Sequence, residues 1–205
     1  MKIYDYKFAP NPRRVRIFLA EKGIQVPLEE IDIMKGANRQ RPEFLRKNPL
    51  GGIPVLELDD GKCIAESVAI CRYFEEQNPN PPLFGTGPLE RAEIEMWNRR
   101  MELALFVSIG MVWVHQHELT RASGRFKQIP EVGEQHRKLV EQRYKWLDDE
   151  LANRKFMAGE NYSIADITAL CAMDFAKFNN ISIQPDQKNL ARWHETVSSR
   201  PSAAA

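Results

Sequence analysis

A glutamate followed directly by a serine, Glu66-Ser67, stands where an apolar helical pattern begins. A serine hydroxyl and the unpaired N–H groups of a helix N-terminus together make a site for a carboxylate. A neighbouring glutamate can pair with an ammonium group, so the dipeptide could hold a ligand that carries both charges. The alternative is that the two residues only cap the helix, because serine is a common capping residue.

The elements that must position this dipeptide are predicted from the periodicity of the first part of the chain. Alternating residues indicate strands, and apolar residues three to four apart indicate helices. Asp59-Asp60-Gly61 between two short strands indicates a hairpin. The predicted order is strand, helix, strand, helix, strand, strand, helix, over residues 2–6, 12–22, 28–33, 42–47, 55–58, 62–65 and 66–77. This order predicts an α/β unit, a small mixed sheet covered by helices.

A segment rich in proline and glycine, residues 78–88, interrupts the pattern and predicts a linker. Everything after it has helical spacing, so we expect an all-helical second domain. The predicted domains are residues 1–78 and 89–205, with 79–88 between them. The predicted helices span about 89–120, the region of 140–151, 164–178 and about 189–199.

The composition excludes several classes of function. Lys and Arg total 29 against 28 Asp and Glu, a net charge of +1, so neither a nucleic-acid nor an anionic-membrane partner is expected. No signal peptide or membrane-spanning stretch is evident, and a cytoplasmic location is expected. The three cysteines lack a CxxC pair and are predicted to be buried thiols. No metal site is expected, because His115 and His117 lack a third ligand.

Four segments, taken together, resemble the cytosolic glutathione transferases. They are residues 8–22 (FAPNPRRVRIFLAEK), 48–56 (NPLGGIPVL), 65–70 (AESVAI) and 163–167 (SIADI). The last is similar to the capping box of the family's helical domain, in which Ser163 and Asp166 bond reciprocally to the backbone. The resemblance covers nearly the whole chain. It implies a thioredoxin-like first domain, an all-helical second domain, glutathione as co-substrate and a homodimer.

The resemblance implies where glutathione would bind. Pro54 would be the family's cis-proline, and Ile53 would offer its backbone to the cysteinyl part of glutathione; the alternative is an ordinary rigid turn. Glu66 and Ser67 would hold the γ-glutamyl end. Gly52 stands where many relatives carry a lysine for the glycine carboxylate. Arg39 is our candidate for that contact, with Arg41 and Lys47 as alternatives.

The sulfur site departs from the family pattern. Ala9 stands where most relatives carry a hydroxyl or thiol, and it offers only a backbone group. The next polar residue is Asn11, whose amide could donate to a thiolate at a helix N-terminus. With an asparagine in this loop, the chain is similar to bacterial members of the family that include the nu-class disulfide reductases. The alternative is that Asn11 only caps the helix.

The pocket for an electrophile is the least specified part. Phe8, Phe106, Trp113 and His117 are candidates to line it, although aromatics at such spacing also form cores. The resemblance implies a transferase that joins the glutathione thiolate to small apolar electrophiles. A glutathione-dependent disulfide reductase or peroxidase is the alternative, because residues 8–14 contain no cysteine. A non-catalytic binding module is the third hypothesis.

Overall fold

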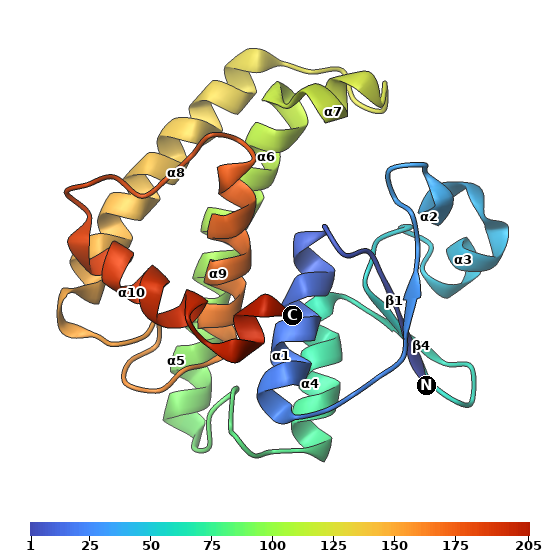
Figure 1. Cartoon of the computed structure of the whole chain (residues 1–205), viewed down its shortest axis with the longest axis horizontal. Coiled ribbons are helices and arrows are strands. Elements are labelled where there is room, and N and C mark those ends of the chain that lie inside the picture. The colour runs from blue at the N-terminus through green and yellow to red at the C-terminus, as the bar shows by residue number, and fades with distance from the viewer. The chain divides into compact units, whose positions relative to one another are not determined.

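The computed structural model describes all 205 residues as two compact units (Figure 1). The first unit comprises Met1–Leu83 and Pro201–Ala205, and the second comprises Phe84–Arg200. The division falls between Leu83 and Phe84, inside the predicted linker. No helix is both long enough and apolar enough to cross a membrane.

The first unit is a four-stranded mixed sheet with helices on both faces. The strand order is β2-β1-β3-β4; β1 pairs parallel with β2 and antiparallel with β3, and β3 pairs antiparallel with β4. This confirms the predicted fold class. Its elements are β1 Lys2–Asp5, α1 Pro10–Lys22, β2 Leu28–Glu30, α2 Ala37–Gln40, α3 Pro42–Lys47, β3 Val55–Glu57, β4 Cys63–Ala65 and α4 Ser67–Gln77. The short helix α2 was not predicted.

Alternation along the strands divides the apolar residues between the two faces of the sheet. Tyr4 and Val55 form a buried cluster with Ile31 and with Phe44 of α3. Ile3, which neighbours Tyr4, is equally buried and points to the opposite face. Helices α1 and α4 pack together on that face, while α2 and α3 lie on the other side of the strands (Figure 1).

The C-terminal segment belongs to the first unit rather than to the helical part. A short helix, η3 (Pro201–Ala204), packs on α1. Arg13 donates from Nη2 to the carbonyl oxygen of Ala203 at 3.0 Å, and the Ser202 hydroxyl donates to the carboxylate of Glu21. The predicted helical domain, 89–205, therefore ends five residues earlier in the structure, because these contacts hold the segment on α1.

The second unit is all-helical, as predicted. Its elements are α5 Pro88–Arg99, the π-helix η1 Arg100–Phe106, α6 Val107–Gln116, α7 Glu118–Ala122, α8 Pro130–Glu150, the 3₁₀ turn η2 Leu151–Asn153, α9 Ile164–Lys177 and α10 Lys188–Ser198. The prediction of one helix over 89–120 was wrong in its C-terminal part. Residue 117 is extended, and the hydroxyl of Thr120 donates to the carbonyl oxygen of Trp113, which closes α6.

The capping box at the start of α9 is confirmed. Ser163 accepts from the N–H of Ala165, and Asp166 accepts in return from the N–H of Ser163 at 3.0 Å. Asp166 is fully buried and also accepts from the N–H of Met157 and from the indole of Trp193. One carboxylate thereby joins the start of α9 to a loop and to α10. Burial raises the pKa of Asp166 to about 6, against the effect of these donors.

Candidate functional site

The predicted site segments leave the sheet at one common edge. Tyr4 of β1 pairs with Val55 of β3, which pairs with Ala65 of β4. Because β3 is antiparallel to both neighbours, the C-terminal ends of β1 and β4 lie beside its N-terminal end. The C-terminal end of β2 lies at this edge as well, since β2 is parallel to β1. The segments that meet the sheet here carry Phe8, Ala9, Asn11, Arg39, Ile53, Pro54, Glu66 and Ser67.

The first turn of α1 leaves a single backbone N–H for a ligand, that of Asn11. Pro10 and Pro12 have no N–H, and the N–H of Arg13 bonds to the carbonyl oxygen of Ala9 at 3.2 Å. The Asn11 side chain is exposed and makes no hydrogen bond in the protein. Asn11 thus presents backbone and amide donors where the helix dipole favours an anion.

The alternative reading of Asn11 as a helix cap is wrong. Ala9 occupies the cap position with an extended backbone, and no side chain caps the helix. Ala9 is only 8% exposed and contributes nothing but backbone at this point. Phe8, by contrast, is 72% exposed, with its ring against that of Tyr6 at 5.9 Å between centroids.

The loop before β3 presents unpaired backbone groups. The Ile53–Pro54 peptide bond is cis, as the resemblance implies. Neither the N–H nor the carbonyl oxygen of Ile53 is hydrogen bonded within the protein. An extended peptide could therefore form backbone hydrogen bonds with Ile53, as an added β-strand would.

Two buried asparagines hold this loop in place. Asn48 donates from Nδ2 to the carbonyl oxygen of Gly52 at 2.9 Å and accepts from the N–H of Leu50. Asn38 of α2 donates to the carbonyl oxygen of Gly51 at 2.6 Å. Gly51 has a φ of +64°, and a Cβ there would lie 3.1 Å from the carbonyl oxygen of Asn38. The loop therefore has little freedom to move away from Ile53.

We predict that Gly51→Ala weakens the binding of glutathione, the ligand that the sequence resemblance implies, whereas Gly61→Ala does not. Both glycines have positive φ, so each substitution should lower the free energy of unfolding by about 1 kcal/mol. Only at Gly51 would the new methyl also crowd Asn38 and the side chain of Arg39, since Gly61 faces open space. Calorimetric titration of both variants with glutathione checks this. Equal affinities in the two variants would show that loop placement does not matter.

Glu66 and Ser67 begin α4 without capping it. Glu66 occupies the cap position with a φ of +69°, and no side chain bonds to the first-turn N–H groups. The capping alternative is therefore wrong. A positive φ in a residue other than glycine is costly, and such positions cluster at ligand sites. Ser67 is 5% exposed, and its Oγ accepts from Nη1 of Arg14 at 2.8 Å.

Arg14 is a residue whose place in the site was not predicted. The structure buries it at 1% exposure against Ser67. The spacing of the sequence did indicate that Arg14 is buried, because it falls four residues before Phe18, on the buried side of α1. The identity of its partner was not readable from this pattern.

The candidate for a glycine carboxylate, Arg39, lies exposed in the last turn of α2 beside Gly51. Of the two alternatives, Lys47 is engaged elsewhere, since its Nζ lies 2.6 Å from Oε1 of Glu57. Arg41 is exposed between α2 and α3. Arg39 and Arg41 therefore remain the candidates for this contact.

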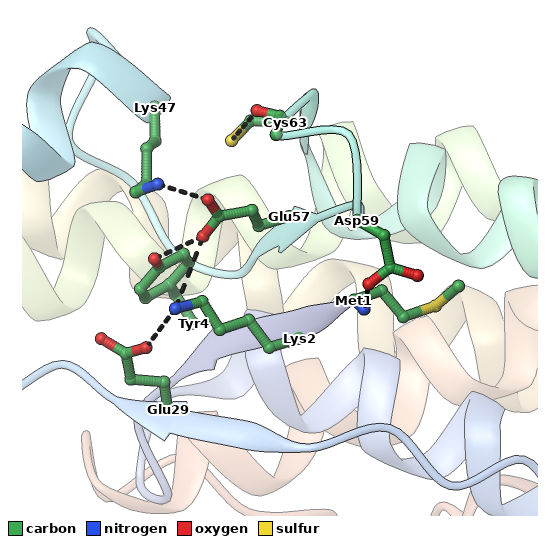
Figure 2. Close-up of polar contacts among 9 residues, drawn as sticks. Met1, Lys2, Tyr4, Glu29, Lys47, Glu57, Asp59 and Cys63 are labelled. Atoms are coloured by element: carbon green, nitrogen blue, oxygen red, sulfur yellow. Dashed lines mark hydrogen bonds and ion pairs between the residues drawn. The ribbon is translucent and has the colours of Figure 1, made fainter.

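A polar cluster ties α3 to the face of the sheet (Figure 2). Glu57 accepts from the ammonium of Lys47 and from the hydroxyl of Tyr4, each at 2.6 Å. Lys2 lies 3.6 Å from Glu57 and 2.8 Å from Glu29. These donors, Lys47 foremost and Tyr4 next, lower the pKa of Glu57 to about 2. Since α3 leads directly into the loop that carries Asn48, this cluster helps to hold that loop in place.

Cys63 stands beside this cluster and is partly buried (Figure 2). Burial raises the pKa of its thiol, which makes a thiolate less available at neutral pH. Cys71 and Cys171 are buried, as predicted, whereas the prediction of burial was wrong for Cys63, which is only partly buried. The Cys63 thiol is therefore not an activated nucleophile.

We predict that the stabilising effect of Glu57 depends on pH. A carboxyl whose pKa is 4.5 when unfolded and about 2 when folded stabilises the fold fully above pH 4.5. That contribution is lost as the pH falls toward 2. Glu57→Gln should therefore lower the free energy of unfolding by roughly 1 kcal/mol near pH 6, after allowance for screening.

Urea unfolding at pH 6 and pH 3 measures this effect, and the difference between wild type and variant should shrink at pH 3. Glu43→Gln, at an exposed carboxylate on α3, is the matched control and should show a smaller difference at both pH values. A pH-independent difference for Glu57→Gln would contradict the lowered pKa.

The other three candidates for an electrophile pocket belong to the second unit. Phe106 is 9% exposed and packs near Phe175, at 6.3 Å between ring centroids. Trp113 stacks on His117 at 3.7 Å, and Nδ1 of His117 accepts from the N–H of Leu119. Phe106 is therefore a core residue, while His117 caps α7. Each side chain thus has a structural role within its own unit.

Comparisons with known proteins agree with this architecture. Residues 3–82 match the family model for the glutathione S-transferase N-terminal domain, and residues 110–201 match the model for the C-terminal domain. Glutathione S-transferase 2 of Saccharomyces cerevisiae is 36% identical over 204 residues, covering 98% of this chain and 87% of that protein.

A crystal structure of a glutathione S-transferase domain-containing protein from Marinobacter aquaeolei has a TM-score of 0.93 at 39% identity, covering 98% of this chain and 99% of that one. The rice protein Elongation factor 1-gamma 2 is 29% identical over 193 residues, covering 93% of this chain and 44% of that protein. The chain belongs to the glutathione S-transferase family, as its sequence motifs imply.

Proposed function

We propose that the protein binds glutathione at the sheet edge of the first unit and transfers its thiolate to small apolar electrophiles. The observation that carries this proposal is the meeting of two helix N-termini and the unpaired backbone of Ile53 at one edge. A tripeptide with two carboxylates, one ammonium and one thiol matches this set of groups. No metal is needed for the reaction.

Each part of glutathione has a proposed partner. The γ-glutamyl carboxylate accepts from Ser67 and the first-turn N–H groups of α4, and the ammonium faces Glu66. The cysteinyl backbone pairs with Ile53, beside Pro54. The glycine carboxylate meets the guanidinium of Arg39. This assignment would leave the thiol near the start of α1.

Asn11 is the proposed activator of the sulfur. A thiol with a pKa of about 8.5 is only a few per cent ionised at neutral pH. Lowering its pKa by two units requires about 2.7 kcal/mol. One charge-assisted hydrogen bond and a helix N-terminus supply energies of this order. The amide and backbone N–H of Asn11 can therefore replace the hydroxyl that Ala9 lacks.

We predict that glutathione bound to the wild type ionises about one to two pH units below the free thiol. Asn11→Ala should lose at least half of that shift, because the side-chain donor is removed. The measurement is an ultraviolet thiolate titration of the bound ligand. Asn153→Ala, at an exposed asparagine of the second unit, is the control and should titrate as the wild type does.

An unshifted thiol in the wild type would contradict the catalytic proposal and favour a binding module. The relatives named elongation factor 1-gamma make that outcome a real alternative. A shifted thiol with faster turnover of hydroxyethyl disulfide than of chlorodinitrobenzene would instead assign a disulfide reductase. Faster conjugation of chlorodinitrobenzene supports the transferase.

We also propose that the protein is a homodimer. An exposed apolar stripe follows α5, η1 and α6 at intervals of seven, seven and four residues, formed by Leu89, Met96, Leu103 and Val107. An isologous two-fold contact would cover the stripe of one copy with a surface of the other. Charged pairs such as Arg99 with Glu95 flank the stripe and give it a polar rim.

We predict that Leu103→Asp weakens the dimer by at least tenfold, about 1.4 kcal/mol, because it places a charge in an apolar contact. Sedimentation equilibrium measures this. Leu119→Asp, at another exposed leucine of the second unit, is the control and should leave the association unchanged. A monomeric wild type would overturn the proposal.

A further inference from the structure

The hydrogen bond between Arg14 and Ser67 determines what the serine can offer to a ligand. Arg14 lies in α1, 53 residues from Ser67 in the sequence, and both side chains are buried. A guanidinium donates hydrogen bonds and accepts none. In this pair Ser67 is therefore the acceptor, and its own hydroxyl proton is directed elsewhere.

No protein group accepts that hydroxyl proton. Ser67 is the first residue of α4, and its Oγ takes part in one hydrogen bond, the one from Arg14. The serine therefore presents a donor at a helix N-terminus that already favours anions. Its neighbour Glu66, exposed and set at a φ of +69°, presents an acceptor. The site thus has a donor side and an acceptor side on adjacent residues.

We propose that Arg14 is a positioning residue that, through Ser67, directs the γ-glutamyl carboxylate of glutathione to Ser67 and its ammonium to Glu66. The inference rests on the proposed glutathione site and adds the residue that sets the polarity of its γ-glutamyl contact. If the partner at position 14 did not only donate, the hydroxyl of Ser67 could point its proton toward that position. A ligand carboxylate would then meet the oxygen lone pairs instead of the proton.

Three ligands separate this role from a general effect on the fold. They are glutathione, 4-aminobutyryl-Cys-Gly, which lacks the γ-glutamyl carboxylate, and glutaryl-Cys-Gly, which lacks the ammonium. Calorimetry gives the affinity of the wild type for each. We expect removal of the carboxylate to cost at least about tenfold in affinity, the magnitude of one charge-assisted hydrogen bond.

Two substitutions test the polarity directly. Arg14→Gln removes the guanidinium donor and leaves the serine hydroxyl free to point away from a ligand carboxylate, so the affinities for glutathione and glutaryl-Cys-Gly should fall by about tenfold. The affinity for 4-aminobutyryl-Cys-Gly should change by less than about twofold, the scatter expected of a site that keeps its other contacts. Arg14→Lys, which can only donate, should retain most of the wild-type preference for the carboxylate.

Arg16→Gln is the matched control, because Arg16 lies on the same helix and pairs with Asp5 at 2.5 Å rather than with Ser67. Its ligand preference should equal that of the wild type. A parallel loss for all three ligands in Arg14→Gln would assign Arg14 a purely structural role and overturn the inference. An unchanged preference in Arg14→Gln would overturn it as well.

The wild-type measurements keep the inference testable if the Arg14 variants do not fold. A preference of less than about twofold for glutathione over 4-aminobutyryl-Cys-Gly would then reject the proposed polarity. If the wild type binds none of the three ligands, the proposed function itself fails. Binding of glutathione without carboxylate preference leaves that function standing and rejects only the role of Arg14.

Discussion

The antiparallel pairing of β3 with both β1 and β4 is the constraint on which the candidate site depends. A strand that enters between two oppositely directed neighbours places its own start beside their ends. The register of Tyr4, Val55 and Ala65 thereby brings three loops to one edge of the sheet, although Tyr4 and Ala65 are 61 residues apart in the chain. A pairing of β3 parallel to β1 would have moved Ile53 to the opposite edge.

The site built on this edge consists mainly of backbone and helix termini. Two prolines leave Asn11 as the sole first-turn N–H donor of α1, and Ile53 contributes unpaired main-chain groups. Backbone donors of this kind need no side-chain ordering when a ligand arrives, so less of the binding energy is lost to entropy. The strained backbone of Glu66 also limits the ordering that binding requires, because it fixes an exposed carboxylate beside the start of α4.

Support for the site comes from groups that no ligand would touch. Asn38 and Asn48 immobilise the loop before β3, and the Lys47–Glu57–Tyr4 contacts hold α3 against the sheet. The low pKa of Glu57 records how strongly this cluster favours the ionised carboxylate. Arg14 has a comparable place, since it donates a buried hydrogen bond to Ser67. The precision of the edge therefore depends on buried polar contacts as much as on the sheet.

The sequence by itself determined most of the elements and the fold class. Period-two and period-3.6 patterns, the Asp-Gly hairpin, the proline-rich linker and the Ser163–Asp166 capping box all arise from residues close together in the chain. Local chemistry of this kind is readable without a tertiary structure. It also sufficed to single out the segments around Asn11, Ile53 and Ser67, whose roles toward glutathione remain predictions.

Only the tertiary structure decided features whose partners are distant in sequence. The end of α6 is one, because Thr120 and Gln128 satisfy its last carbonyl groups while the apolar spacing continues past it. The docking of residues 201–205 on α1 is another, since it requires Glu21 and Arg13. The burial of Arg14 is the third, because a charged side chain is seldom buried without a hydrogen-bond partner. One partner, Ser67, is specified by the packing of α4 on α1 and not by any local pattern.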